Sequence, residues 1–246
     1  MSRTPVWLLP HRLSLDAPVV ALVWQDFVAR CYPSPLRIPG RCVLGLTVWA
    51  IYLADRLLDA KRGDDAESFY RKHWGAMASL LALVLGCDLV TAVLWLRPVV
   101  FRNGLALAFA VGAYLCLFSY VRLGMLTWKR VAAAALFSSG VFLVASTSWT
   151  ADRLLLPWTG FALLCLCNLR TIIHLEWRKH IDAVFCIWAG ALCVLCVVEG
   201  GPPRWNLALA TGAVGLVALA HWGRSLPKNT GRVLADAVLL APILYR

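Results

Sequence analysis

Apolar residues along the chain are gathered into nine blocks, which short clusters of Arg, Lys, Asp, Pro and Gly separate. Long blocks of this kind predict α-helices that cross a lipid bilayer. Several blocks are shorter than the roughly 20 residues of a straight span, so those helices must extend into their flanks, stop against neighbours or not cross at all. The blocks cover residues 15–29, 42–54, 74–96, 104–121, 131–148, 154–169, 183–198, 205–222 and 233–245.

Composition agrees with a membrane protein, because 61% of the 246 residues are hydrophobic and only 15% are charged. A soluble domain of this length would need more polar surface. No repeat, low-complexity tract or linker separates one part of the chain from another. We therefore predict one all-α domain over residues 1–246, a polytopic transmembrane helical bundle of about nine helices.

The distribution of basic residues predicts the orientation of this bundle. With nine spans, 16 of the 24 Lys and Arg residues fall on the side of the N-terminus and 8 fall on the other side. Cytoplasmic loops carry the excess of Lys and Arg in membrane proteins. We therefore expect a multi-pass protein with a cytoplasmic N-terminus and an external C-terminus.

The formal charge of +11 raises the question of a partner for the basic residues. They lie in short loops between helices and form no single patch or tail, which argues against nucleic acid. Anionic membrane lipids and topology account for the charge in one interpretation. A basic inner surface would equally suit an anionic substrate such as a diphosphate.

Two acidic residues that could take part in catalysis or metal binding lie at the inner end of the second block. Asp55 and Asp59 are four residues apart, so on a continuing helix both carboxylates project from one face. Two such carboxylates can hold Mg²⁺, which commonly joins protein carboxylates to substrate phosphates. The alternative is an ordinary helix end whose acids are neutralised by Arg56 and Arg62.

A second polar cluster follows the sixth block, in residues 168–182. If the helix continues through it, Asn168, Ile172 and Glu176 recur every four residues on one face. Asn168 and Glu176 could then supply oxygen ligands opposite the first cluster, and they would suit Mg²⁺ better than zinc. A solvated, charged loop is the competing interpretation.

Three motifs together resemble the UbiA superfamily of intramembrane prenyltransferases. The segment 15–18, Leu-Asp-Ala-Pro, is similar to the opening of the family's first helix. The segment 55–59, Asp-Arg-Leu-Leu-Asp, resembles the later half of its first aspartate motif, although Ile51 and Tyr52 stand where the family has Asn and Asp. Tyr120, Lys129 and Arg130 resemble its Tyr-x-x-x-Lys-Arg loop element.

The resemblance implies a UbiA-like fold, a cytoplasmic active-site mouth, Mg²⁺ as the cofactor and an isoprenoid diphosphate as the substrate. It gives roles to three sets of residues. The catalytic metal ligands would be Asp55, Asp59, Asn168 and Glu176. The diphosphate would be bound by Arg56, Lys129, Arg130, Arg178 and Lys179. The allylic carbocation would be stabilised by Trp49, Tyr52 and Trp177.

Three functions stay open at this point. Capture of the carbocation by a lipophilic or aromatic acceptor would make the protein a prenyltransferase. Capture by a double bond of the same chain would make it a membrane terpene cyclase. A transporter or noncatalytic scaffold is the third possibility, for which Gln25, Asp26 and Asp88 are the polar residues deep within blocks.

Overall fold

A computed structural model describes residues 13–61, 68–120, 126–177, 183–198 and 201–245. Within these ranges the chain is all helical and contains no β-strand. Its contacts divide it into two compact units, and the boundaries between them fall within α2 (Asp16–Cys31) and after Pro35 and Arg122. Unit 1 takes its described residues from Met1–Leu22 and Leu36–Arg122, and unit 2 takes them from Val23–Pro35 and Leu123–Arg246.

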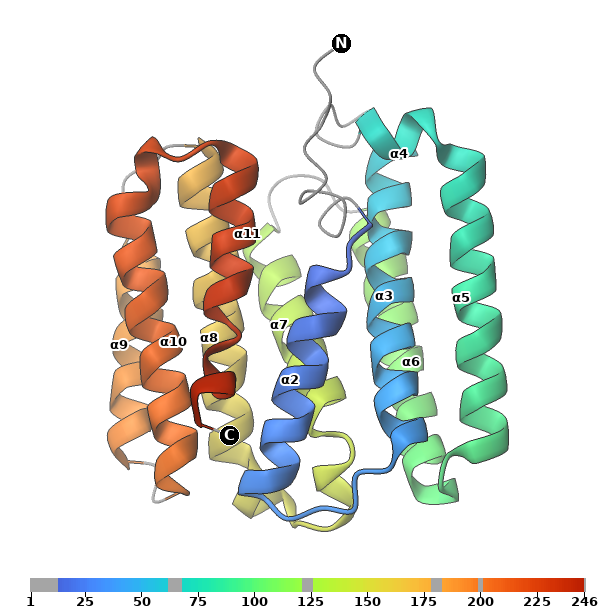
Figure 1. Ribbon diagram of the computed structural model, residues 1–246, viewed down its shortest axis with the longest axis horizontal. Coiled ribbons are helices and arrows are strands. Elements are labelled where there is room, and N and C mark those ends of the chain that lie inside the picture. The colour runs from blue at the N-terminus through green and yellow to red at the C-terminus, as the bar shows by residue number, and fades with distance from the viewer. Residues whose placement is uncertain (1–12, 62–67, 121–125, 178–182, 199–200, 246) are drawn as a thin grey trace. The chain divides into compact units, whose positions relative to one another are not determined.

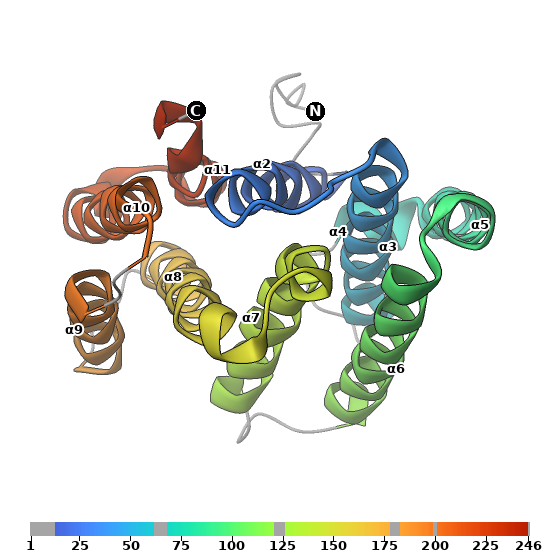
Figure 2. The same ribbon diagram turned by 90° about the horizontal axis from the view of Figure 1, so that it is seen from below.

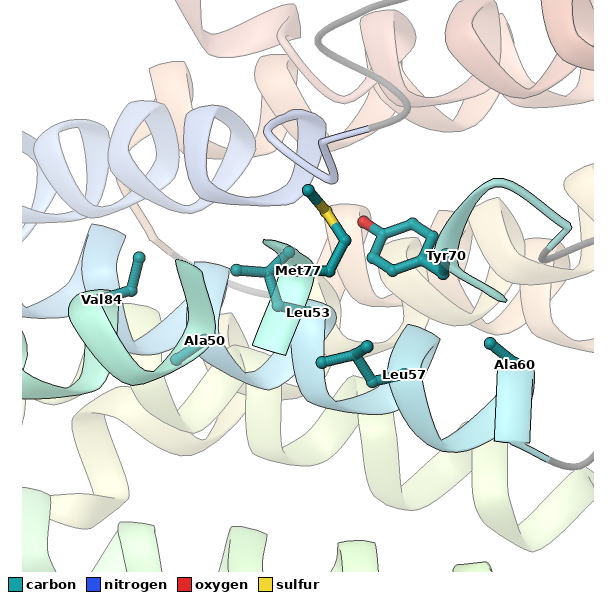
Figure 3. Close-up of a cluster of buried hydrophobic side chains, with 7 residues drawn as sticks. All are labelled: Ala50, Leu53, Leu57, Ala60, Tyr70, Met77 and Val84. Atoms are coloured by element: carbon teal, nitrogen blue, oxygen red, sulfur yellow. The ribbon is translucent and has the colours of Figure 1, made fainter. Parts of the chain in front are cut away.

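Unit 1 is built around the packing of α3 (Ile38–Lys61) along α5 (Trp74–Trp95). It also contains the first part of α2, the short α4 (Ser68–Lys72) and α6 (Pro98–Tyr120) (Figure 1). Figure 3 shows the buried cluster that joins α3, α4 and α5. Its members are Ala50, Leu53, Leu57, Ala60, Tyr70, Met77 and Val84. The members from α3 recur at spacings of three and four residues, so they form one apolar stripe on that helix.

Unit 2 is organised around α8 (Ala151–Trp177), which contacts four other helices of the unit. These are α7 (Leu126–Phe142), α9 (Ala183–Val198), α10 (Pro203–Trp222) and α11 (Lys228–Val238). Figure 2 shows α8 between α7 and α10, with α9 beside them. Three short 3₁₀ turns follow α7, α10 and α11, namely η4 (Ala145–Thr147), η5 (Gly223–Ser225) and η6 (Ala241–Tyr245).

Aromatic side chains form the core of unit 2. Trp24 is fully buried, its ring centroid lies 4.4 Å from that of Phe161, and its indole nitrogen donates a 2.7 Å hydrogen bond to the carbonyl oxygen of Leu239. Trp205 is also fully buried and meets Trp24 edge to face at 5.4 Å. Offset and edge-to-face ring pairs of this kind add to the stability gained from burial. The core therefore ties the second part of α2 to α8, α10 and the end of α11.

Small residues let the helices of unit 2 approach closely. A Cβ atom placed on Gly215 of α10 would lie 2.7 Å from Cγ1 of Val238 in α11. A Cβ atom on Gly212 would lie 3.1 Å from Cδ2 of Leu164 in α8. At these two positions a hydrogen atom in place of a side chain is what permits the contact.

Four described helices are long and apolar enough to cross a membrane: Trp74–Trp95, Pro98–Leu117, Ala151–Leu175 and Pro203–Trp222. In the first two, only 11% and 6% of the apolar window is buried against protein. Large apolar side chains such as Leu89 and Phe109 are 63% and 74% exposed there. Helices that are apolar on their exposed sides suit lipid, not water. The described part of the chain is therefore helical, and these four helices support a membrane protein by their length and composition.

Eight of the nine predicted blocks each overlap one described helix, and the ninth, 233–245, spans the second half of α11 and the 3₁₀ turn η6. Several boundaries differ. The block at 42–54 is part of the longer α3, which begins at Ile38 and ends at Lys61. The helix predicted for the block at 131–148 ends before the block does, because α7 stops at Phe142 and a 3₁₀ turn follows. The block at 154–169 continues as α8 to Trp177, so the interpretation of residues 168–177 as a solvated loop is wrong. Nine membrane crossings stay a prediction.

Candidate functional site

The acidic pair of the second block lies in the last two turns of α3. The helix continues through Asp55 and Asp59 to Lys61, as the proposed pairing of their carboxylates requires. At 3.6 residues per turn, Asp55 and Asp59 lie about 200° and 240° around the helix from Leu53. Leu53 packs in the cluster against α5, so the carboxylates point away from that contact. Both acidic residues are half-buried.

Two tyrosines accompany the acidic pair. Tyr52 precedes Asp55 by three residues and Asp59 by seven, so it shares their face of α3. Tyr114 comes from α6 of the same unit and is close enough for both carboxylates to act on its hydroxyl electrostatically. Tyr114 was not predicted from the sequence, where its one visible signal is a phenol within a strongly apolar block.

The carboxylates of this site can be compared with the ligands that Mg²⁺ prefers. Among the residues that the structure describes, no group of three or more His, Cys, Asp or Glu side chains could hold a metal. Mg²⁺ does not need such a cage, because it is usually bound by one or two carboxylates together with substrate phosphates and water. Asp55 and Asp59 on one face of α3 fit a cation that shares its coordination with a substrate.

The described part of the second polar cluster, residues 168–177, is also helical, but the partner of Asn168 was not expected. Asn168 is 5% exposed, and its Nδ2 donates a 3.0 Å hydrogen bond to Oδ1 of Asp236 in α11. The Oδ1 atom of Asn168 is buried and accepts no hydrogen bond. Asp236 lies within the ninth apolar block, residues 233–245, where no role was predicted for it from the sequence. Its pairing with α8 could be found only from the folded chain.

Two further polar residues of α8 are directed to α9. The guanidinium carbon of Arg170 lies 5.6 Å from the centre of the Trp188 ring, within the range of a cation–π contact. The ring of His174 is buried and meets Phe185 edge to face at 5.7 Å. These contacts fix α9 against α8, and they give His174 and Arg170 a packing role.

The other predicted site residues are distributed along the chain. Trp49 packs against the buried cluster of unit 1, and its indole nitrogen donates a 2.8 Å hydrogen bond to the carbonyl oxygen of Leu13. It therefore belongs to the packed side of α3, whereas Tyr52 lies beside the acids. Arg56 is half-buried next to Asp55. Its role in diphosphate binding stays a prediction.

The remaining residues belong to unit 2. Lys129 and Arg130 are half-buried in the first turn of α7. Glu176 and Trp177 end α8, and the structure describes their backbone but not their side chains. Arg178 and Lys179 lie outside the described residues. The metal, diphosphate and carbocation roles of these residues stay predictions.

Two of the three polar residues that suggested a transporter, Asp26 and Asp88, have local partners. Arg30 Nη2 lies 2.6 Å from Oδ2 of Asp26, one turn earlier in α2. Thr47 of α3 donates a 2.7 Å hydrogen bond to Oδ2 of Asp88 in α5. Gln25 is buried at 2% exposure. Asp26 and Asp88 thus act in contacts within α2 and between α3 and α5.

Comparison with known proteins gives no identification. No family model, no curated protein and no solved structure matches the chain.

Proposed function

We propose that the chain is a Mg²⁺-dependent intramembrane enzyme that ionises an isoprenoid diphosphate and transfers the prenyl group to a lipophilic or aromatic acceptor. One observation carries the proposal: Asp55 and Asp59 share a face of α3 that points away from the helix's own packing contact with α5. Two carboxylates on one helix face can share a hard cation with a substrate that carries phosphate groups. Tyr114 and Tyr52 add a phenol and an aromatic ring beside them.

The chemistry requires the bond between the allylic carbon and the diphosphate oxygen to break, with the electron pair leaving on the diphosphate. Asp55 and Asp59 would hold Mg²⁺, which supplies neutralisation of the charge that develops on the leaving group. The Tyr114 hydroxyl, which is near both carboxylates, would donate a hydrogen bond to a phosphate oxygen. Arg56, next to Asp55, would add a charge-assisted hydrogen bond.

The carbocation that remains must be protected until it is captured. The ring of Tyr52 can stabilise it by a cation–π interaction, worth up to about 2 kcal/mol in a desolvated site. Apolar helices keep water from the cation. Attack by the π electrons of an acceptor, followed by loss of a proton, completes the transfer.

The orientation of the chain forms part of the proposal. A UbiA-like bundle of nine crossings would place the N-terminus and the inner end of α3 on the cytoplasmic side. The excess of Lys and Arg in the loops of that side supports this orientation. A water-soluble diphosphate would then reach Asp55 and Asp59 from the cytoplasm while its prenyl chain lies in the membrane.

The decisive assay incubates the purified protein, in lipid, with C10, C15 and C20 prenyl diphosphates and Mg²⁺. Each incubation is run with and without an aromatic acceptor. Release of diphosphate with an acceptor adduct supports transfer. Release with a cyclic hydrocarbon or alcohol and no adduct supports a membrane terpene cyclase instead. No release with any of the three substrates contradicts both and favours a transporter or scaffold.

Single variants test the metal ligands. Asp55→Asn and Asp59→Asn keep the side-chain shape but remove the charge, so each should lower Mg²⁺-dependent release at least about tenfold, the lower end of the loss seen when metal-site groups are removed. Asp152→Asn, at an exposed position in the first turn of α8, is the matched control and should leave release unchanged. Unchanged turnover in both α3 variants would refute the metal assignment.

A further inference from the structure

We infer that one end of unit 1, where α3 begins, α5 ends and α6 begins, binds an anionic phospholipid. The phosphate group of the lipid meets arginine side chains, and its acyl chains lie on the apolar surfaces of α5 and α6. The arginines of this end are Arg37, Arg41, Arg97 and Arg102. This site is separate from the proposed diphosphate site, which lies at the other end of α3.

The arginines come together because α3 and α5 run in opposite directions within unit 1 (Figure 1). Thr47 of α3 donates a hydrogen bond to Asp88 of α5, so each step back along α3 from Thr47 matches a step forward along α5 from Asp88. Nine steps reach Ile38, the first residue of α3, and Arg97, which connects α5 to α6. All four arginines lie within five residues of one of these two points.

This end of unit 1 lies at a membrane surface if α3 crosses the bilayer. Arg41 and Asp59 are 18 positions apart on α3, which is about 27 Å along the axis of an α-helix. The hydrocarbon core of a bilayer is about 30 Å thick, so the arginines and the acidic pair lie at opposite surfaces. Trp95, the last residue of α5, is 58% exposed beside the arginines, as is typical of an aromatic residue at a membrane surface.

The positive charge of this end is not balanced by acidic residues. The described part of unit 1 has four, and all lie elsewhere: Asp16, Asp55, Asp59 and Asp88. Asp55 and Asp59 are in the last turns of α3, and Asp16 follows Ser14, whose hydroxyl lies 2.9 Å from that of Tyr70 in α4. Asp88 precedes Arg97 by nine residues, about two and a half turns deeper in α5. The end of unit 1 therefore attracts an anion.

The use of arginine favours phosphate as that anion. With nine spans, all eight basic residues on this side of the membrane are arginine, and every lysine of the chain falls on the other side. The topology rule treats Lys and Arg alike and favours the opposite side, so it does not explain this cluster. A guanidinium binds phosphate oxygens through two parallel hydrogen bonds, which an ammonium group cannot do.

Exposed apolar side chains continue from the arginines along α5 and α6. Leu94 and Val99, on the two sides of the connection, are 63% and 49% exposed. Leu105 and Phe109, further along α6, are 48% and 74% exposed. A soluble anion would use the arginines alone. Arginines next to an exposed apolar surface fit a ligand that has a phosphate group and long acyl chains, which is a phospholipid.

The inference is tested by thermal unfolding of the full chain, purified in detergent and stripped of lipid. Phosphatidylglycerol, phosphatidylcholine with the same acyl chains, and inorganic phosphate are added in separate titrations. A ligand that binds the folded protein raises its unfolding temperature. We expect phosphatidylglycerol to raise it more than either of the others. Equal shifts with the two lipids, or an equal shift with inorganic phosphate, would overturn the inference.

Paired variants locate the site. Arg37→Gln with Arg102→Gln changes two exposed residues, so the fold should persist, and the half-saturating concentration of phosphatidylglycerol should rise at least about tenfold. Arg153→Gln with Arg204→Gln removes the same charge from exposed positions of unit 2 and should leave that concentration unchanged. An unchanged response in the first pair, or an equal loss in both pairs, would overturn the site. Neither measurement involves turnover, so failure of the proposed enzyme activity would leave both results standing.

Discussion

Replacement of single glycines by alanine should have opposite effects in the two units. Gly86 in α5 has no atom within 4 Å of the position that a Cβ atom would take. Gly215 in α10 has Cγ1 of Val238 at 2.7 Å, and Gly212 has Cδ atoms of Leu164 at 3.1 and 3.2 Å. The three positions are matched in chemistry, because each change adds one methyl group within a helix.

The expected change in stability at each position follows from two competing effects. Alanine is favoured over glycine in a helix interior by at most about 1 kcal/mol, and this gain applies at all three positions. Overpacking of a close contact costs about 1–3 kcal/mol. At Gly215 the obstacle is a β-branched valine, whose χ1 is restricted in a helix, so Val238 can yield only if α11 moves. At Gly212 the ends of a leucine side chain can turn aside more easily.

The expected order of stability is therefore Gly86→Ala, then Gly212→Ala, then Gly215→Ala. For a chain of this size about 1 kcal/mol corresponds to 2–4 °C in the unfolding temperature. We expect Gly86→Ala to match or exceed the unaltered protein by up to about 4 °C, and Gly215→Ala to fall below it by up to about 8 °C. Thermal unfolding in one detergent, followed by tryptophan fluorescence, measures all three. A Gly215→Ala protein as stable as Gly86→Ala would refute the close approach of α10 and α11.

Three other outcomes can be checked directly. Trp24→Phe removes the hydrogen bond to the Leu239 carbonyl, so it should lower the unfolding free energy by about 1 kcal/mol or more, as denaturation of the variant would show. Burial raises the pKa of the Cys31 thiol to about 11, although the charge of Arg204 lowers it in part. The alkylation of Cys31 should therefore be slow at pH 7 and accelerate as the pH approaches 11. A rate that stops rising by pH 10 would contradict that shift, because a thiol with its ordinary pKa is already almost fully ionised there. A reporter fused after Arg246 should be active only outside the cytoplasm, and cytoplasmic activity would exclude the proposed orientation.

The helices of this protein could be predicted from hydrophobic blocks, because a membrane helix needs a long apolar run and few other structures produce one. The ends of the helices were less predictable. The charged residues Asp55 and Asp59 lower the apolar signal of α3, yet the helix continues through them to Lys61. In α8 the polar residues after Asn168 suggested a loop or a helix equally well, and packing against α9, α10 and α11 decides for the helix.

The candidate site was predictable only where its residues are close in sequence. A spacing of four places Asp55 and Asp59 together without any knowledge of the fold. Tyr114 lies 55 residues after Asp59, and Asp236 lies 68 residues after Asn168, so only tertiary structure brings each to its partner. Long-range pairs leave no periodic signal in a single sequence.

The hydrogen bond between Trp24 and Leu239 joins residues 215 positions apart, and both belong to unit 2. A ribosome that inserts this chain from its N-terminus must therefore release almost the whole protein before Trp24 can form this hydrogen bond. Phe161 and Trp205 become available to the Trp24 ring earlier, so the contact with Leu239 is the last of the three to form. The assembly of unit 2 is therefore completed only when its C-terminal end is present, and a chain that stops short of α11 would leave α2 without its contact to Leu239.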